Sequence, residues 1–291
     1  MNRDELVSLA EPVSWNTKTL SKLVAFSETE ILKPIGMAFG SYGSVRMMQR
    51  NREAQRNWVW RMPIVPGLGF GIEALPESMS YLVTDNGTSL AKIGNLDGDH
   101  VCSVLRASCQ LIYELSPELY NSVGSLLRCL HILENLEPGY DLSLSLPELP
   151  HSIFTSVPFV HEKDAIPRLA ESVVHEVLHL QLSLIERISP VVRPSADTEF
   201  VYAPWRDENR PIGGVIHGLF VFRGIEILWS RSSRILPNEV YDFAQKRVDE
   251  IRNQRKLIEA RNFSSLTRFG QDLFLRLIAD SDECEIESDT A

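Results

Sequence analysis

The chain has 291 residues, a formal net charge of −10 and 44% hydrophobic residues. Its length suits one large or two small domains, and its composition is that of a soluble globular protein. The acidic charge argues against general nucleic-acid binding, which requires a basic surface. No apolar run reaches the ~18 residues of a membrane span, and the first residues lack an apolar signal core. We therefore expect a cytoplasmic protein with no membrane partner.

Residues 1–135 predict a helical and hairpin region with a possible role in peptide recognition. Helices are expected within 1–35, over 100–115 and over 116–134, and Asn86-Gly87 between apolar runs predicts a hairpin. An arginine-rich stretch lies between the first two helical segments. It is interpreted as a solvated helix face, or alternatively as a docking surface for an acidic partner or peptide. Its arginines are Arg46, Arg50, Arg52, Arg56 and Arg61.

Residues 136–280 predict the catalytic region, followed by an acidic tail over 281–291; the alternative is one domain throughout. Alternating residues over 138–160 favour strands, and a helix capped by Asp164 is expected to reach about Arg187. A polar loop over 189–211 precedes an apolar helix over 212–233, and helices near 237–260 and 262–279 complete the chain. The pattern as a whole predicts an α+β fold that is mostly α-helical with a few short strands and hairpins.

The motif His-Glu-x-x-His occupies residues 175–179. His175 and His179 stand four residues apart on one helix face, so both imidazoles can bind one metal ion. Glu176 projects about 100° away around the helix, from where it can serve as a general base or hydrogen-bond to a metal ligand. The alternative is coincidence, because a five-residue pattern with two free positions also occurs by chance.

A metal site needs a third ligand, and His217 is the leading candidate because it opens the next helix between Gly214 and Gly218. Those glycines and Gly213 are expected to let that helix approach the motif helix or a ligand closely. Taken alone, His217 is more typical of a hydrogen-bonded core histidine, and the neighbouring motif helix is what favours a ligand. Carboxylates elsewhere stay open as ligands, and Glu186 is either a partner of a ligand or the polar edge of its helix. The alternative ligands are Glu199, Asp207, Glu208 and Glu226.

Arg206 and Arg210 lie four residues apart between two prolines, beside Trp205. A fixed arginine pair is suited to bidentate binding of a planar carboxylate. The alternative is a surface loop in which Asp207 and Glu208 pair with these arginines.

These segments together resemble a known family. His-Glu-Val-Leu-His-Leu-Gln-Leu at 175–182, Pro-Trp-Arg-Asp at 204–207, Arg-Pro at 210–211 and Gly-Val-Ile-His-Gly at 214–218 are similar to the HExxH-motif peptide-modification proteins of ribosomal peptide natural-product pathways. Residues 150–158 share the resemblance, which covers about residues 140–230 and does not extend to the first 100.

The resemblance implies an iron(II)- and 2-oxoglutarate-dependent oxygenase that hydroxylates a β-carbon in a precursor peptide. His175, His179 and His217 would then hold Fe(II), and Glu176 would act as a base or contact a metal ligand without binding the metal itself. Arg206 or Arg210, beside Trp205, would bind the distal carboxylate of 2-oxoglutarate. Three histidines differ from the common set of two histidines and one carboxylate, so Asp207 and Glu208 remain candidate ligands.

Two other functions are compatible with the sequence. A zinc metallopeptidase would use the same motif, with Glu176 activating a water molecule, but the glycine turn and third histidine of the longer HExxHxxGxxH motif are absent. A non-enzymatic peptide-binding protein would use the motif helix only as structure. The sequence does not predict the oligomeric state.

Overall fold

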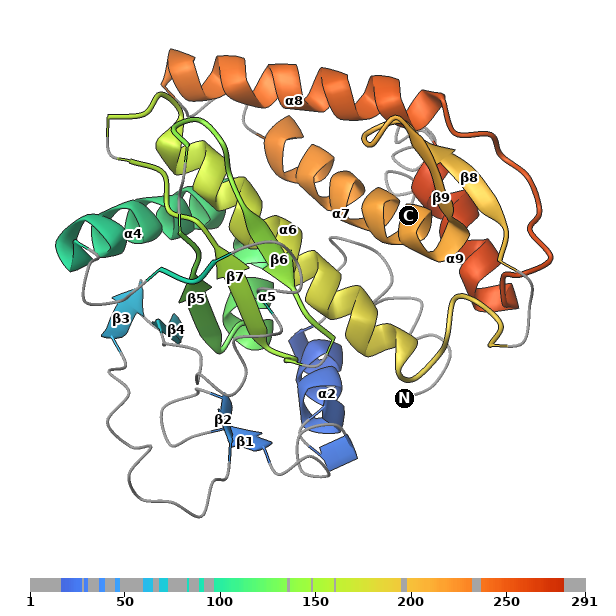
Figure 1. Ribbon diagram of the computed structural model, residues 1–291, viewed down its shortest axis with the longest axis horizontal. Helices are drawn as coiled ribbons and strands as arrows, with labels where there is room; N and C mark the ends of the chain where they lie inside the picture. The colour runs from blue at the N-terminus through green and yellow to red at the C-terminus, as the bar shows by residue number, and fades with distance from the viewer. Residues whose placement is uncertain are drawn as a thin grey trace, which may run out of the picture.

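A computed structural model gives the architecture of the chain (Figure 1). It describes residues 17–27, 29–30, 37–39, 45–47, 60–64, 68–72, 83, 89–91, 97–134, 137–147, 149–159, 161–194, 198–231 and 237–279. Asn86-Gly87, the acidic tail and the side chains of the arginine-rich stretch lie outside this description. Within it, the fold is α+β and mostly helical, which confirms the predicted class.

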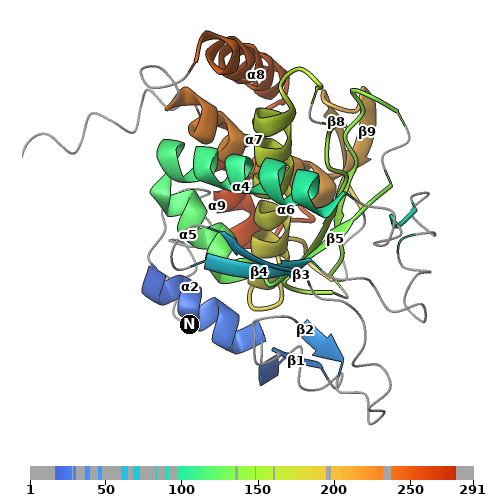
Figure 2. The ribbon, with the colours of Figure 1, turned by 90° about the vertical axis from the view of Figure 1, so that its left-hand side faces the viewer.

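The helices surround the long central helix α6. They are α2 (Thr17–Ser27), α4 (Gly98–Leu115), α5 (Pro117–Leu126), α6 (Ala165–Glu186), α7 (Ile212–Ser230), α8 (Asn238–Lys256) and α9 (Arg268–Ile278). Helix α6 packs on α4, α5 and α7, while α8 lies across α7. Figure 2 shows α4 crossing α6, with α8 at one end of the molecule and β1–β2 at the other.

A five-stranded mixed sheet packs against α4, α5 and α6, in the order β3-β4-β5-β7-β6. Its strands are β3 (Trp60–Ile64), β4 (Leu68–Ile72), β5 (Cys129–Ile132), β6 (Ser143–Ser145) and β7 (Ser152–Thr155). Strands β5 and β7 are parallel and buried on both faces, and β6 runs antiparallel to β7 at the end of the sheet. Separate two-stranded hairpins are formed by β1 (Met37–Phe39) with β2 (Val45–Met47) and by β8 (Phe200–Ala203) with β9 (Glu208–Pro211).

The predicted helix over 116–134 is wrong in its second half. It ends at Leu126, and residues 129–132 continue as β5. A strand buried on both faces is a continuous apolar run that cannot be distinguished from a buried helix by periodicity. His131 faces the side of the sheet away from the helices and stacks on Phe154 with ring centroids 4.6 Å apart, as expected for a core histidine. β5 pairs with β7 across the predicted boundary at 135/136.

Four further expectations are corrected. The predicted loop over 189–211 contains the β8–β9 hairpin, and the last helix begins at Arg268 because Thr267 caps it. In the arginine-rich stretch, the described backbone at 45–47 and 60–64 is strand rather than helix. Asp164 precedes α6 as predicted, but its side chain makes no capping hydrogen bond and its backbone is left-handed, with φ of 60°.

Helix α7 is long and apolar enough to cross a membrane, yet 67% of its most apolar window is buried inside the fold. This burial is typical of a core helix. Its contact with α6 requires Gly224, because a Cβ there would lie 2.4 Å from Cδ1 of Leu178. The glycines singled out from the sequence have other roles: Gly213 faces Val192, and a Cβ on Gly214 would meet nothing within 4 Å.

His151 ties α2 to the sheet. The residue is fully buried with φ of 68°; its Nδ1–H donates to the carbonyl of Leu126, and Nε2 is bonded to the Ser27 hydroxyl. Burial lowers the pKa of His151 from its ordinary 6.5 to about 4. The folded state therefore favours the neutral imidazole.

We expect the chain to lose stability as the pH falls from 6.5 towards 4. In that window the unfolded chain binds a proton that buried His151 does not, so His151 alone lowers the free energy of unfolding by about 3 kcal/mol. His151→Asn, which tolerates the left-handed backbone, should reduce the pH dependence measured by urea unfolding, while His175 and His179 maintain the remainder. An unchanged pH dependence would contradict this role of His151.

Candidate functional site

The three predicted histidines meet between α6 and α7. His175 and His179 lie one turn apart on α6 with ring centroids 4.9 Å apart, and His217 in the second turn of α7 stacks on His179 at 5.6 Å. Their side chains are partly exposed, 29% for His175 and 22% for His217. The sequence therefore identified three imidazoles that the fold brings together.

Glu186 orients His217. Its Oε2 lies 2.8 Å from Nε2 of His217, and Nδ1 of the same ring lies 3.3 Å from Nδ1 of His179. With the Nε2–H donated to Glu186, the Nδ1 of His217 presents a lone pair towards His179. A carboxylate that holds the second nitrogen of an imidazole in this way is the usual partner of a metal-binding histidine.

The histidine pair fits a metal ion in part. Two nitrogens that bind one tetrahedral metal at ~2.0–2.1 Å lie ~3.3–3.4 Å apart, and the His179–His217 separation is 3.3 Å. The same separation also suits an N–H···N hydrogen bond. Among the residues that the structure describes, no three His, Cys, Asp or Glu side chains are grouped so as to hold a metal. His175 therefore belongs to the cluster without completing a three-ligand set.

The two α6 histidines are held neutral. Burial is the main cause that lowers the pKa of His175 to about 4, and the charges of Arg247 and Arg206 act in the same direction. Burial likewise lowers the pKa of His179 to about 3, helped by His175 and opposed by Glu176. A neutral imidazole keeps the lone pair that a metal or a proton donor requires.

Glu176 points from α6 towards strand β6. Only 3% of its side chain is exposed, and its Oε1 accepts a hydrogen bond of 2.7 Å from the Ser143 hydroxyl, while the Ser145 side chain also bonds to it. Burial raises the pKa of Glu176, and His179 and the two serines oppose that rise. Glu176 lies 3.9 Å from Nε2 of His175, so it borders the cluster and joins the motif helix to the sheet.

The two predicted arginines separate in the structure. Arg206 is exposed in the β8–β9 turn, where its charge acts on His175, whereas Arg210 pairs with Glu208 at 3.1 Å on the exposed hairpin. Asp207 accepts a hydrogen bond of 2.6 Å from the Tyr202 hydroxyl. Arg210 therefore adopts the predicted alternative, a surface ion pair within the loop. Asp207 and Glu208, the alternative metal ligands, each already bond to another side chain of the hairpin.

Trp205 lies against α7 beside His217. It packs on Phe222 with centroids 5.3 Å apart, and a Cβ on Gly218 would lie 2.4 Å from its Cζ2. Gly218 therefore admits the indole ring, not the motif helix. Trp205 fixes the start of the hairpin turn that carries Arg206.

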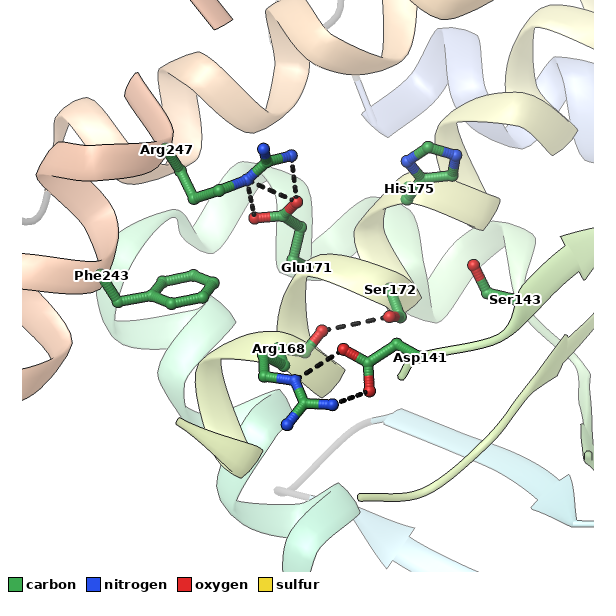
Figure 3. A pocket seen from close by; sticks show the side chains of 8 residues that line it. All are labelled: Asp141, Ser143, Arg168, Glu171, Ser172, His175, Phe243 and Arg247. Atoms are coloured by element: carbon green, nitrogen blue, oxygen red, sulfur yellow. Dashed lines mark hydrogen bonds and ion pairs between the residues drawn. The ribbon is translucent and has the colours of Figure 1, made fainter. Parts of the chain in front are cut away.

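A cavity of about 240 Å³ opens beside His175 and was not predicted from the sequence (Figure 3). Glu171, one turn before His175, binds Arg247 of α8 at 2.6 Å, and Arg168 binds Asp141 at 2.6 Å. Helical spacing from His175 was a signal for Glu171 and Arg168. Arg247 carried no such signal, because only the packing of α8 on α7 brings it here.

No protein-family model matches the chain, and no curated protein matches it.

Proposed function

We propose that the chain is an iron(II)- and 2-oxoglutarate-dependent oxygenase that hydroxylates a β-carbon of a residue in a ribosomally made precursor peptide. The observation that carries the proposal is the convergence of His175, His179 and His217, with Glu186 holding the far nitrogen of His217. The motif combination of the sequence resembles the peptide-modification family and supports the choice of chemistry. The proposal assigns the metal to the three imidazoles and the cosubstrate to the side of the cluster near Arg206, apart from the cavity that Arg168 and Arg247 line.

The residues of this chain have separable roles in the proposal. Bound iron with 2-oxoglutarate would supply the oxidising power for C–H hydroxylation. His179 and His217 would provide two nitrogens at a spacing that suits one ion, and His175 the third by turning its ring. Because burial lowers the pKa of His175 and of His179, these two imidazoles need lose no proton when the metal binds.

Cations near His175 support the binding of an anionic cosubstrate. Arg206 is the better candidate for the distal carboxylate of 2-oxoglutarate, because its field reaches His175 while Arg210 is paired with Glu208. Trp205, packed on α7, would fix the position of the turn that carries Arg206. Glu176 would position the motif helix through Ser143 rather than activate water, since its carboxylate is buried and hydrogen-bonded.

Product analysis separates this proposal from the peptidase and from a non-enzymatic role. The iron-loaded protein with 2-oxoglutarate and dioxygen should give an intact peptide that is one oxygen atom heavier, as oxygenase cofactor chemistry requires. A zinc-loaded protein that cleaves the peptide without 2-oxoglutarate would establish the peptidase instead. Peptide binding without either product, unchanged in His179→Ala, would establish the non-enzymatic role.

A further inference from the structure

Strand β6 leaves one edge of the sheet open beside the histidine cluster. The sheet order ends at β6, and β6 pairs only with β7 among the described strands. The Leu142 carbonyl accepts a hydrogen bond from the Ser156 amide, so Leu142 faces β7. Along an antiparallel strand, residues whose backbone groups point to the neighbouring strand alternate with residues whose backbone groups point away. The backbone N–H and C=O groups of Ser143 and Ser145 therefore point away from β7.

The same strand joins the open edge to the motif helix. The side chains of Ser143 and Ser145 bond to Glu176, while Leu144 packs on the opposite face of the sheet. Natural edge strands are usually protected by charges or prolines; here Asp141 and Pro147 border the strand, and Leu142–Leu146 between them contains neither. Among the described residues, the outward backbone groups of Ser143 and Ser145 have no partner strand and can accept one.

The open edge leads directly into the cavity beside His175. Asp141 and Ser143 form one wall of that cavity, Phe243 and Arg247 of α8 form the opposite wall, and α6 lies between them (Figure 3). A peptide strand that binds a sheet edge obtains affinity from backbone hydrogen bonds and specificity from a pocket for one side chain. Here the edge and the pocket are continuous.

Both arginines of the cavity walls are fully paired with carboxylates. All three guanidinium nitrogens of Arg247 donate to Glu171 or Glu250, and those of Arg168 donate to Asp141 or Glu162. An anionic guest could reach a guanidinium only by breaking one of these ion pairs, at the cost of leaving a partly buried partner unpaired. An uncharged side chain with hydrogen-bonding groups would not have to break one.

We infer that an extended peptide adds to the free edge of β6 and places an uncharged polar side chain in the cavity beside His175. The inference rests on the proposed function for the peptide nature of the substrate, and names how that substrate binds. In this inference, two or three residues of the peptide form backbone hydrogen bonds with Ser143 and Ser145.

The test measures binding without turnover, so that it stands apart from the oxygenase chemistry. Metal-free protein in EDTA is titrated with fluorescein-labelled, capped heptapeptides Thr-Val-Thr-Xaa-Thr-Val-Thr, in which Xaa is Asn, Ser, Asp, Lys or Leu. The Asn or Ser peptide should bind more tightly than the Asp peptide, and tighter binding of the Lys peptide would assign the cavity to a cation instead. N-methylation of the bound peptide should weaken binding at alternate positions only, because alternate amides face β6.

Two matched proline variants test the edge itself. Ser145→Pro removes an outward-facing amide from β6 and should weaken binding about five- to tenfold relative to Ser145→Ala, which removes only the hydroxyl that bonds to Glu176; this is the effect of one backbone hydrogen bond. Asn209→Pro removes the corresponding outward amide from the exposed strand β9 and should leave affinity unchanged. Circular dichroism confirms that both variants are folded.

Several results would overturn the inference. They are the absence of binding by every peptide, a loss that does not alternate along the methylated peptide, and equal effects of the two proline variants. A wild-type dimer that Ser145→Pro converts to a monomer would assign the edge to a second copy of the chain instead. If affinity falls at alternate methylated positions but no oxygenated product forms, peptide binding at β6 is supported and the oxygenase proposal is rejected. If product forms but the loss of affinity does not alternate, the oxygenase proposal is supported and binding at β6 is rejected.

Discussion

His217→Ala is expected to abolish tight binding of iron(II) while the protein stays folded. Metal binding should be lost because His217 contributes one of the two closely spaced nitrogens. The fold should be retained because the side chain is 22% exposed and its removal leaves only a small cavity. Glu186→Gln should lower metal affinity by about 10–100-fold, which is typical when the carboxylate that orients a ligand is removed. Anaerobic calorimetric titration with iron(II), with cobalt(II) as a stable substitute, measures both effects.

Glu208→Gln is the matched control for Glu186→Gln. Glu208 pairs with Arg210 on the exposed hairpin and should have no influence on the metal. A loss of affinity in Glu208→Gln that equals the loss in Glu186→Gln would show that a carboxylate of the hairpin is the third ligand. Wild-type affinity in His217→Ala would remove the histidine cluster as the metal site.

Gly224→Ala is expected to destabilise the contact between α6 and α7. The new methyl group would lie 2.4 Å from Leu178, which is completely buried and stands between His175 and His179 in the chain. Overpacking of this kind costs about 1–3 kcal/mol in the free energy of unfolding, which exceeds the ~0.5–1 kcal/mol that alanine gains over glycine in a helix. Urea unfolding measures the net loss.

Gly214→Ala in the same helix is the control, because its methyl group would meet nothing within 4 Å. It should leave stability unchanged or raise it slightly. Equal stabilities of the two variants would show that the helices move apart freely at Gly224. A metal affinity that falls in Gly224→Ala but not in Gly214→Ala would link the helix spacing to the histidine cluster.

The elements with strong periodicity and clear ends were predictable. The helix that contains the motif, the apolar helix that begins at Ile212, and the strands near 143–145 and 152–155 agree with their patterns. Residues 129–132 could not be assigned, because burial on both faces removes the alternation that identifies a strand. The β8–β9 hairpin was missed because its turn carries Trp205 and Arg206 rather than the Asn-Gly or Asp-Gly typical of tight hairpins.

The candidate site was predictable where residues share one helix and less so where tertiary packing joins them. His175 and His179 follow from four-residue spacing, and His217 from its position after the motif. Arg247 reaches the site only through α8, 72 residues after His175 in the chain. The Glu176 side chain points towards strand β6 because Ser143 of that strand bonds to it. The sequence of the motif helix alone cannot predict this contact.

The most direct test of the central claim is succinate formation from 2-oxoglutarate by protein reconstituted anaerobically with iron(II) and then supplied with dioxygen. The Asn heptapeptide serves as the substrate. Wild-type protein should form succinate in proportion to bound iron, and His179→Ala should form at least ~100-fold less, since loss of a ligand exceeds the effect of losing its orienting partner. The absence of iron-dependent succinate in the wild type, or equal succinate from His179→Ala, would contradict the proposed function.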